Sequence, residues 1–489
     1  MTETSRSELA ASGARGGLAT LLAQASLLLL RVASLAILAR LLAPEIFGTV
    51  AIATAIVMFT TQIAFLGLPM SSVRPAELSS AAQSWLLLIN TGLGLAMAAV
   101  LLTLSSWIAQ LYQNPLLGVV LPWLAVVPIT AGFQQQFRVR LIRALRFRSL
   151  ATAEVVASSV AILASIGIAL AGGTWQAIVV QLLVQQLVQM SIVMALARHS
   201  PALPGRFREE VAPIVRIGAQ LSASELLRSL GRYAIVPVTG LFVSPTSLGY
   251  FDRAQQLTVM PASLLTDQLQ RVVVPILSRV RSTPATYLRF LTSAQRATAY
   301  AASFGFLIAA ALADPLVTLF LGSDWDQSAT IFRFLAVGAA FRAIAQSMQW
   351  VFVSGRSSDG LRLNAWLQPT IVAVSLAGVP WGVLGVAAFN ALAWLVAWPL
   401  TAVFAARSAG VRTGALLSPG LRALLACAPA ALIASAALTL PIAPIFILIV
   451  GGAWGSLAFG ILTILIPTVR KDVREIARIF KLALKPKSR

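Results

Sequence analysis

The sequence predicts an all-α polytopic membrane protein with about fourteen transmembrane helices, and three observations support this fold class. The 489-residue chain is 58% hydrophobic and only 11% charged, with a mean hydropathy of +0.85. Apolar runs long enough to cross a bilayer recur along almost the whole chain. Basic residues gather in every second connection between these runs. Soluble globular domains do not combine these features.

Residues 1–15 form a polar N-terminal tail that we expect in the cytoplasm. The apolar stretch after it is too long for the core of a signal peptide, so we expect an uncleaved first helix. The fourteen apolar runs lie at about residues 18–40, 46–68, 84–108, 117–137, 151–171, 175–197, 213–241, 249–271, 293–313, 328–353, 363–379, 382–405, 421–440 and 444–467.

The positive-inside rule tests this helix count. With the N-terminus in the cytoplasm, 27 of the 37 Lys and Arg residues fall in cytoplasmic segments. Only Arg40 falls in a loop on the periplasmic side, and nine arginines lie within helices. One helix more or fewer in the count would place every later loop on the opposite side of the membrane. The asymmetry therefore predicts fourteen spans with both termini in the cytoplasm.

Short repeated motifs predict two related halves. The Pro-x-x-x-Gly pattern of residues 44–48 recurs at 245–249, and at the same offset Arg31 corresponds to Arg232. LAGGTW (170–175) resembles LAGVPW (376–381), with equal numbers of helices between the motifs. An even number of helices per repeat gives both halves the same orientation, with a pseudo-symmetry axis along the membrane normal.

The repeats and charge pattern predict the domain organisation. An N-terminal six-helix bundle (16–197) is joined by a cytoplasmic linker (198–212) to a C-terminal six-helix bundle (213–405), and two extra helices occupy 406–467. A basic amphipathic cytoplasmic tail (468–489) completes the chain. Its apolar residues Val473, Ile476, Ala477, Phe480 and Leu484 follow a helical period, which predicts a helix on the anionic inner leaflet; a plain solvated tail is the alternative.

Several enzyme classes are excluded by residue content. The chain has one His (His199), no Gly-Lys dipeptide for a Walker A loop, and a single Cys427, which we expect in the core or facing lipid. Asp324-Trp325-Asp326 has a D-x-D metal spacing, but we interpret it as a loop in which Asp324 or Ser323 caps the next helix. We expect no enzyme activity, no cofactor and no metal site.

The net charge of +21 does not predict nucleic-acid binding, because the basic residues lie between apolar runs as topology signals do. The expected partners are membrane lipids and a membrane-borne substrate.

Arginines near mid-depth of the predicted helices are the main functional signal. Arg31, Arg228, Arg232 and Arg342 fall near the bilayer midplane at 1.5 Å per residue. Each arginine there costs about 2.5–3.5 kcal/mol on insertion scales. Glu225 shares a helix face with Arg228 and Arg232, at spacings of i, i+3 and i+7.

Two interpretations of these arginines remain open. Internal ion pairs are the first, but only four acids lie in or near the helices against nine arginines: Glu154, Glu225, Asp252 and Asp267. The second, which we favour, is a water-filled cavity whose positive potential attracts an anion.

Other polar residues fall outside this midplane group. Arg253 and Arg333 lie nearer the outer surface, while Arg216, Arg271 and Arg296 lie near the inner surface, where their side chains can reach headgroups. Gln181, Gln185 and Gln189 form a stripe at i+4 spacing that either holds helices together or hydrogen-bonds sugar hydroxyls.

Four stretches resemble a known family: LLAPEIFG (41–48), RALRFRSL (143–150), LGYFDRAQQL (248–257) and LFLGSDWDQSATIFRFLAV (319–337). They are similar to signatures of polysaccharide exporters of the Wzx/colanic-acid-exporter type, in the multidrug/oligosaccharidyl-lipid/polysaccharide (MOP) flippase superfamily. The resemblance implies two six-helix bundles that open alternately to each side. It also implies transport of undecaprenyl-diphosphate-linked oligosaccharide from the cytoplasmic to the periplasmic leaflet of the bacterial inner membrane.

The resemblance also bears on single residues. Arg253 matches an arginine of the family pattern, whereas Ile235 stands where the family usually has an Asp, so Glu225 is the remaining candidate for ion coupling. We expect the substrate to contact Arg31, Arg228, Arg232, Arg342, Arg253, Gln181 and Gln185.

Such a flippase would serve exopolysaccharide or lipopolysaccharide biosynthesis, with a polysaccharide polymerase and glycosyltransferases as functional neighbours. The alternatives are a cation-coupled multidrug antiporter, which would need acids in its cavity, and a membrane glycosyltransferase or polymerase, which would need a catalytic domain.

Overall fold

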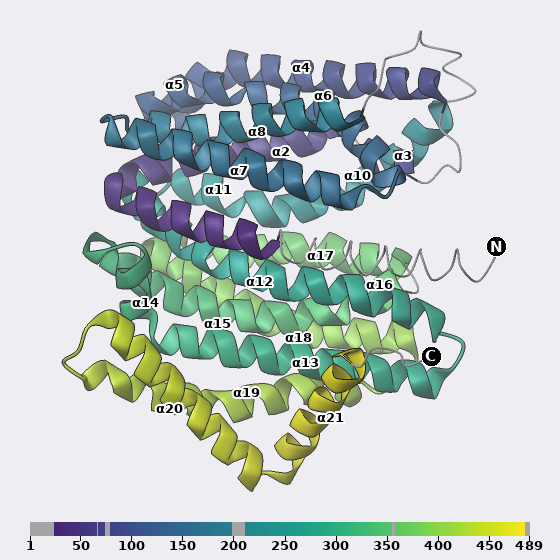
Figure 1. Ribbon diagram of the computed structural model, residues 1–489, viewed down its shortest axis with the longest axis vertical. Coiled ribbons are helices and arrows are strands. Elements are labelled where there is room, and N and C mark those ends of the chain that lie inside the picture. The colour runs from purple at the N-terminus through teal and green to yellow at the C-terminus, as the bar shows by residue number, and fades with distance from the viewer. Residues whose placement is uncertain (1–23, 66, 74–78, 198–210, 355–356, 485–489) are drawn as a thin grey trace. The chain divides into compact units, whose positions relative to one another are not determined.

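The computed structural model describes residues 24–65, 67–73, 79–197, 211–354 and 357–484. Within these ranges every regular element is an α-helix or a short 3-10 helix, as Figure 1 shows. The predicted all-α class is therefore confirmed. The predicted N-terminal tail (1–15) and nearly all of the predicted linker (198–212) lie outside the described residues.

Contacts divide the chain into two units, residues 1–249 and 250–489. The first unit contains the helix Gln24–Leu41 followed by α2 (Pro44–Phe65), α3 (Leu68–Val73), α4 (Ser80–Leu111), α5 (Pro115–Leu124), α6 (Val126–Arg143), α7 (Phe147–Leu170), α8 (Trp175–Ala197), α10 (Ala212–Tyr233), α11 (Ile235–Gly240) and the start of α12 (Pro245–Arg279).

The second unit contains most of α12 and the remaining helices. These are α13 (Pro284–Ala311), α14 (Ala313–Phe320), η1 (Ser323–Trp325), α15 (Asp326–Met348), α16 (Trp350–Val353), α17 (Ser357–Leu376), η2 (Val379–Trp381), α18 (Gly382–Ala409), α19 (Thr413–Ser435), η3 (Ala436–Thr439), α20 (Pro444–Leu465) and α21 (Pro467–Leu484).

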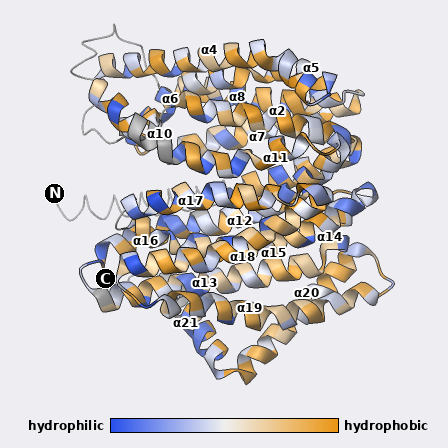
Figure 2. Ribbon diagram, turned by 180° about the vertical axis from the view of Figure 1, so that it is seen from behind, coloured by the Kyte–Doolittle hydropathy of each residue, from blue (hydrophilic) through white to orange (hydrophobic). Residues whose placement is uncertain are grey.

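The described helices include ten that are long and apolar enough to cross a membrane, or eleven when α13 and α14, which meet at 82°, count as one broken span. One of the ten, Ser358–Ala409, contains both α17 and α18. The predicted spans 213–241 and 249–271 correspond to α10–α11 and α12, which carry several charges and fall outside the ten. Figure 2 shows how widely apolar residues cover the helices of each unit.

The division between units falls at Gly249, later in the chain than the linker expected at 198–212. Helices α10 and α11 contact α2, and α10 also contacts α3, so the seventh predicted span groups with the first unit. Sequence repeats indicate common ancestry of segments, whereas this division follows which helices pack together.

The repeated motifs occupy equivalent places in the helices. Pro44 begins α2 and Pro245 begins α12, while LAGGTW and LAGVPW both lie at turns, between α7 and α8 and between α17 and α18. The two Pro-x-x-x-Gly motifs also lie against each other: a Cβ at Gly48 would overlap the carbonyl oxygen of Pro245, and one at Gly249 would overlap that of Pro44. Glycine is required at this crossing because the backbones of α2 and α12 touch.

The second unit has a large apolar core that also covers part of the C-terminal tail. Trp350, Trp394 and Trp398 are buried in it together with Cys427. Of the two places expected for the cysteine, the core is therefore the one observed. The tail is helical, as predicted, and forms α21. However, Val473 and Ile476 of the predicted apolar stripe pack on this core, whereas Ala477 is exposed. The side chains of Phe480 and Leu484 lie outside the described residues.

Candidate functional site

The polar face of α10 is the centre of the candidate site. The Glu225 carboxylate accepts hydrogen bonds from Arg228 Nε (3.1 Å) and Nη2 (2.5 Å), so these two side chains form an ion pair at i, i+3. Of the two interpretations, internal pairing therefore holds for Arg228. Both side chains are nevertheless well exposed, at 47% and 38%, which keeps this charged face accessible.

Arg232, one helical turn further along α10, differs from Arg228. It is exposed, and its guanidinium carbon lies 5.9 Å from the centroid of the neighbouring Tyr233 ring. Within the described part of the chain, Arg232 has no ion-pair partner. The charge of Arg232 is therefore not neutralised by a carboxylate of the described residues, and its place in a water-filled cavity stays a prediction.

Arg31 is paired across helices. Its Nη2 lies 3.3 Å from Glu154 Oε1 on α7, and the arginine side chain remains half exposed. One turn further along the same helix, Ser34 Oγ accepts a hydrogen bond of 2.9 Å from Gln181 Nε2 on α8. Gln181 thus holds two helices together, which is one of the two roles expected for the glutamine stripe. Gln185 is half-buried, and we find no hydrogen bond from it among the described residues.

Arg253 is held in a buried ion pair. Its Nη2 and Nε donate to Asp252 Oδ2 at 2.6 and 3.1 Å, and Gln256 Nε2 donates to the same oxygen at 3.0 Å. A buried pair of this kind is costly to break, because removing one partner leaves an uncompensated charge. The local geometry therefore gives Arg253 a structural role in the first turns of α12.

Arg342 lies in a small cavity of the second unit, between α12, α15 and α18. Its guanidinium carbon is 5.5 Å from the centroid of the Trp394 ring, a cation–π contact. Three neutral polar residues also line this cavity, namely Gln255, Thr258 and Asn390. The volume of about 30 Å³ accommodates about two water molecules. Sequence reasoning missed these three residues, because no spacing along the chain connects them with Arg342.

The predicted midplane group is thus distributed over both units. Arg31, Arg228 and Arg232 belong to the first unit, and Arg342 belongs to the second. A common substrate site for all four remains a prediction.

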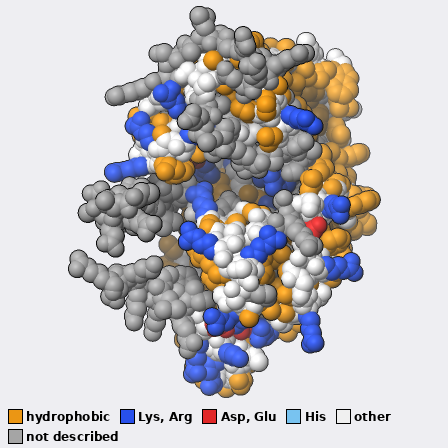
Figure 3. Space-filling view, turned by 90° about the vertical axis from the view of Figure 1, so that its right-hand side faces the viewer, with side chains coloured by type: hydrophobic (Ala, Val, Ile, Leu, Met, Phe, Trp, Pro, Cys, Tyr) orange, Lys and Arg blue, Asp and Glu red, His pale blue; other side chains and the backbone are white. Residues whose placement is uncertain are grey.

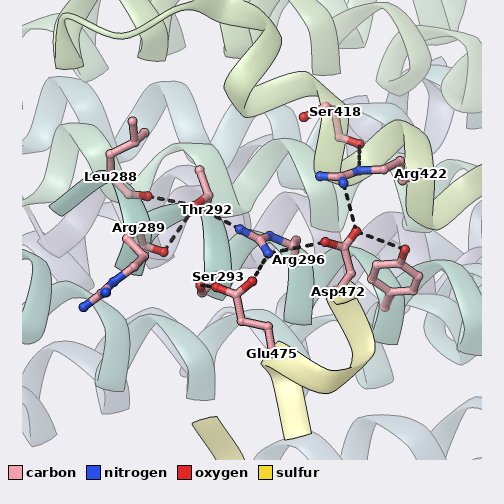
Figure 4. Close-up of polar contacts among 10 residues, drawn as sticks. Leu288, Arg289, Thr292, Ser293, Arg296, Ser418, Arg422, Asp472 and Glu475 are labelled. Atoms are coloured by element: carbon pink, nitrogen blue, oxygen red, sulfur yellow. Dashed lines mark hydrogen bonds and ion pairs between the residues drawn. The ribbon is translucent and has the colours of Figure 1, made fainter. Parts of the chain in front are cut away.

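Two other predicted positions have ion-pair partners. Arg333 pairs with Asp314 of α14. Arg296, expected to reach the headgroups, instead takes part in a network with the C-terminal helix α21 (Figure 4). This position corrects the prediction: Arg296 donates to Asp472 (3.3 Å) and to Glu475, because both acids of α21 point back into the second unit.

The rest of this network comes from α13 and α19. Tyr300 OH and Arg422 Nη1 lie 3.3 and 3.4 Å from Asp472 Oδ2, and Ser293 Oγ donates to Glu475 Oε1 at 2.8 Å. The Asp472 side chain is only 1% exposed. Two arginines therefore balance two carboxylates in a largely buried cluster.

The network also shifts the titration of Glu475. Burial of the carboxyl group acts to raise its pKa, but hydrogen bonds from Ser293 and Arg296, with the charges of Arg296 and Lys471, outweigh burial and lower the pKa. Glu475 consequently stays ionised to a lower pH than an ordinary glutamate.

We expect the attachment of α21 to weaken in acid. A carboxylate with a lowered folded pKa stabilises the fold above its unfolded pKa, here about 4.5, and this contribution disappears as the pH falls through the folded value. The melting temperature of the wild type should therefore decrease more steeply below that pH than the melting temperature of Glu475→Gln. Parallel curves for the two proteins would contradict a stabilising role for the Glu475 carboxylate.

The D-x-D segment does not form a metal site among the described residues. No group of three or more His, Cys, Asp and Glu side chains gathers there or elsewhere in the described ranges. The predicted cap is wrong: Trp325 takes the N-cap position of α15, and no side chain bonds to the first turn. Trp325 is buried, and its ring is nearly perpendicular to the Tyr250 ring with the two centroids 5.7 Å apart, so the segment is part of the packing of the second unit.

The helical arrangement is shared with solved membrane transporters. The structure titled "Lipid II flippase MurJ, inward closed conformation" is similar with a TM-score of 0.73 at 13% identity, covering 92% of this chain and 97% of that chain. The inward-facing structure of a multidrug resistance MATE family transporter of the MOP superfamily is similar with a TM-score of 0.61 at 14% identity, covering 80% of this chain and 95% of that chain. At such identities the likeness shows the fold alone.

Two curated relatives are similar in sequence. The "Succinoglycan biosynthesis transport protein ExoT" of Rhizobium meliloti (strain 1021) is 24% identical over 313 residues, which cover 63% of this chain and 62% of ExoT. The "Lipopolysaccharide biosynthesis protein WzxC" of Escherichia coli (strain K12) is 22% identical over 317 residues, 63% of each chain. This chain thus spans slightly less than two thirds of the length of these relatives.

The family expected from the four signature stretches is confirmed. Residues 37–330 match the family described as "Polysaccharide biosynthesis protein", and this range includes three of the four stretches and the first twelve residues of the fourth. The match covers more than half of the sequence, and the chain therefore belongs to the polysaccharide biosynthesis protein family.

Proposed function

We propose that this protein translocates lipid-linked oligosaccharide repeat units across the bacterial inner membrane for exopolysaccharide or lipopolysaccharide biosynthesis. The carrier would be undecaprenyl diphosphate, and the direction would be from the cytoplasmic to the periplasmic leaflet. The family match, the names of the two relatives and the fold in common with a lipid II flippase support this proposal. The protein would be a transporter and not an enzyme.

The observation that carries this proposal is the exposed charge of Arg232. This residue lies on α10, within the predicted span 213–241, is exposed, and has no ion-pair partner in the described part of the chain. An unneutralised guanidinium at such a place is stabilised by water and by an anion. The diphosphate group of a lipid-linked sugar supplies that anion, while its polyprenyl chain can remain in lipid.

The other residues would assist Arg232 when the two bundles open alternately to each side. Arg31, Arg228 and Arg342 would bind the diphosphate or acidic sugars, and Gln185 would hydrogen-bond sugar hydroxyls. Glu225 offers a route for ion coupling: a coupling cation at its carboxylate would compete with Arg228 for the ion pair, which alters the charge offered to the substrate. Arg253 would act by holding the start of α12 in place, because it is already neutralised by Asp252.

The multidrug antiporter is the runner-up, since the fold is similar to that of a multidrug transporter. Binding of organic cations needs available carboxylates. Three of the four predicted helix acids, Glu154, Glu225 and Asp252, are each paired with an arginine, and so is Asp314. The side chain of the fourth, Asp267, lies outside the described residues. This pairing leaves an excess of positive charge, which favours an anionic substrate.

Reconstituted full-length protein distinguishes these functions. Proteoliposomes containing undecaprenyl-diphosphate oligosaccharide in one leaflet should expose it in the other faster than protein-free vesicles do. The same vesicles should not accumulate a cationic dye in exchange for protons or sodium, and the glycan should not become longer. Dye exchange without movement of the glycan lipid would reject the proposal in favour of the antiporter.

The proposed topology places both termini in the cytoplasm. Partners would be the glycan lipid, the surrounding lipids, and a polymerase and glycosyltransferases that act on the same glycan. Alkaline phosphatase fused after residue 489 should remain inactive in this topology, because it is active only in the periplasm.

A further inference from the structure

The C-terminal helix α21 is attached to the second unit through both of its acids. Asp472 lies between Arg296 and Arg422, and Glu475 lies between Arg296 and Ser293, as Figure 4 shows. These carboxylates are therefore not available to partners outside the protein.

Three apolar residues of α21 likewise pack within the protein. Val469 is buried at 3% exposure in the core of the second unit, and Val473 and Ile476 pack against that core. Membrane insertion of an amphipathic helix requires its apolar face to enter the acyl region. Val469, Val473 and Ile476 are turned to the protein, so insertion of these three residues does not explain why this part of α21 is basic.

The remaining face of α21 is basic. At 100° per residue, Arg470, Lys471 and Arg474 lie on the arc opposite Val469, Val473 and Ile476. Lys471 and Arg474 are exposed, and Arg470 donates a hydrogen bond to the Ile464 carbonyl oxygen at the end of α20. The attachment thus separates the charges of α21, with acids toward the protein and cations outward.

The place of α21 in the chain sets the environment of this cationic face. The apolar span α20 ends at Leu465 and α21 begins two residues later at Pro467, so α21 starts where the chain leaves the hydrocarbon layer. In Figure 1, α21 turns from the end of α20 back toward α13. Figure 3, which looks at that end of the helices, shows many basic and few acidic side chains. A helix at this level meets lipid headgroups.

We propose that α21 is a fixed strap that binds anionic lipid headgroups through Lys471 and Arg474 while its acids hold it to α13 and α19. The complementary charge argues for this partner: near an anionic leaflet each cation increases binding by about fivefold, which corresponds to about 1 kcal/mol. The two exposed cations together give about 25-fold. Salt weakens such an interaction, since screening shortens its range.

A fluorophore on α21 tests the lipid contact in the full-length protein. The background is Cys427→Ala, which removes the only native thiol, and Ala477→Cys places the label at an exposed position next to the basic residues. Nanodiscs of phosphatidylcholine with increasing phosphatidylglycerol contain a headgroup-nitroxide lipid as quencher. Quenching should increase with phosphatidylglycerol content. The Lys471→Gln/Arg474→Gln variant should have an apparent affinity for phosphatidylglycerol about 25-fold weaker than that of the labelled protein with both cations.

A matched control removes the same charge elsewhere. Arg279 and Arg281 are exposed near the turn between α12 and α13, and Arg279→Gln/Arg281→Gln should leave the response of the label at position 477 unchanged. Equal quenching with and without phosphatidylglycerol would overturn the proposal. So would a Lys471→Gln/Arg474→Gln protein that keeps its lipid response but loses a bound acidic protein, because the partner would then be that protein.

Thiol reactivity tests the attachment itself. In the same background, Ile476→Cys should react at least tenfold more slowly with a water-soluble maleimide than Ala477→Cys, because position 476 faces the core. Adding Asp472→Asn and Glu475→Gln should bring the two rates within about twofold. If that protein does not fold, Glu475→Gln alone should still raise the rate at position 476. Equal rates at the two positions in the otherwise unchanged chain would overturn the strap. None of these readouts depends on transport, so they are independent of the proposed flippase function.

Discussion

Replacing Arg232 with alanine is expected to abolish polymer export while leaving the amount of protein in the membrane unchanged. The side chain is exposed and has no ion-pair partner in the described part of the chain. Its removal therefore deletes a charge without creating a cavity in the core and without leaving a described carboxylate unpaired. A hydrogen bond to a charged group contributes about 1.5–3 kcal/mol. Losing it where the diphosphate binds should slow translocation by about 10- to 150-fold, which would leave polymer at the cell surface below detection at the upper end of this range. The measurement is surface polysaccharide in cells, together with immunoblotting of membranes.

Three variants make this experiment specific. Arg232→Lys keeps the charge and should retain part of the export, because lysine lacks the bidentate geometry of the guanidinium. Arg271→Ala removes an exposed arginine of α12 outside the proposed site and should export normally. Arg228→Ala should reduce export and also leave the Glu225 carboxylate without its partner. Normal export by Arg232→Ala at normal abundance would remove Arg232 from the site.

The local part of the site could be predicted from sequence, and the long-range part could not. The Arg228–Glu225 pair follows from i, i+3 spacing on one helix, which any helical segment imposes. The Arg31–Glu154 pair joins residues 123 positions apart, and the Arg296–Asp472 pair joins residues 176 apart. Their partners are set by how helices pack, so the arginines stood out in the sequence while several of their counter-charges did not.

The C-terminal tail illustrates the same limit for the fold. Its helical period predicted α21, but an apolar stripe fits a lipid surface and a protein core equally well. The decisive feature is the pair Asp472 and Glu475 opposite Arg296 and Arg422, which exists only once α13, α19 and α21 are packed together. Hydropathy likewise could not show that α10 and α11 group with the first unit, because the pattern along one helix does not identify its neighbours.

The Pro-x-x-x-Gly repeat, in contrast, contained more structural information than a turn signal. Gly48 and Gly249 are related by the repeat, and each accommodates the backbone of the other motif. The nearest atoms to an added Cβ are backbone carbonyls of Pro245 and Pro44, which cannot rotate away as a side chain would. Small residues at helix crossings in membranes let backbones approach in this way. The two motifs therefore form one reciprocal contact.

Gly48→Ala and Gly249→Ala are each expected to destabilise the protein by about 3 kcal/mol or more, the upper part of the range for overpacking. The helices α2 and α12 must move apart to admit one methyl group. Once they have done so, a second methyl group at the same crossing costs less free energy. The double variant should consequently lose less than the sum of the two single losses, as coupled sites do. Gly92→Ala on α4 is the control, because no atom lies within 4 Å of its added Cβ, and alanine there should be neutral or stabilising by up to about 1 kcal/mol. Thermal unfolding of these four variants and the wild type in one detergent measures these differences. If Gly48→Ala melts at the same temperature as Gly92→Ala, the close crossing of α2 and α12 is not the contact that holds these motifs together.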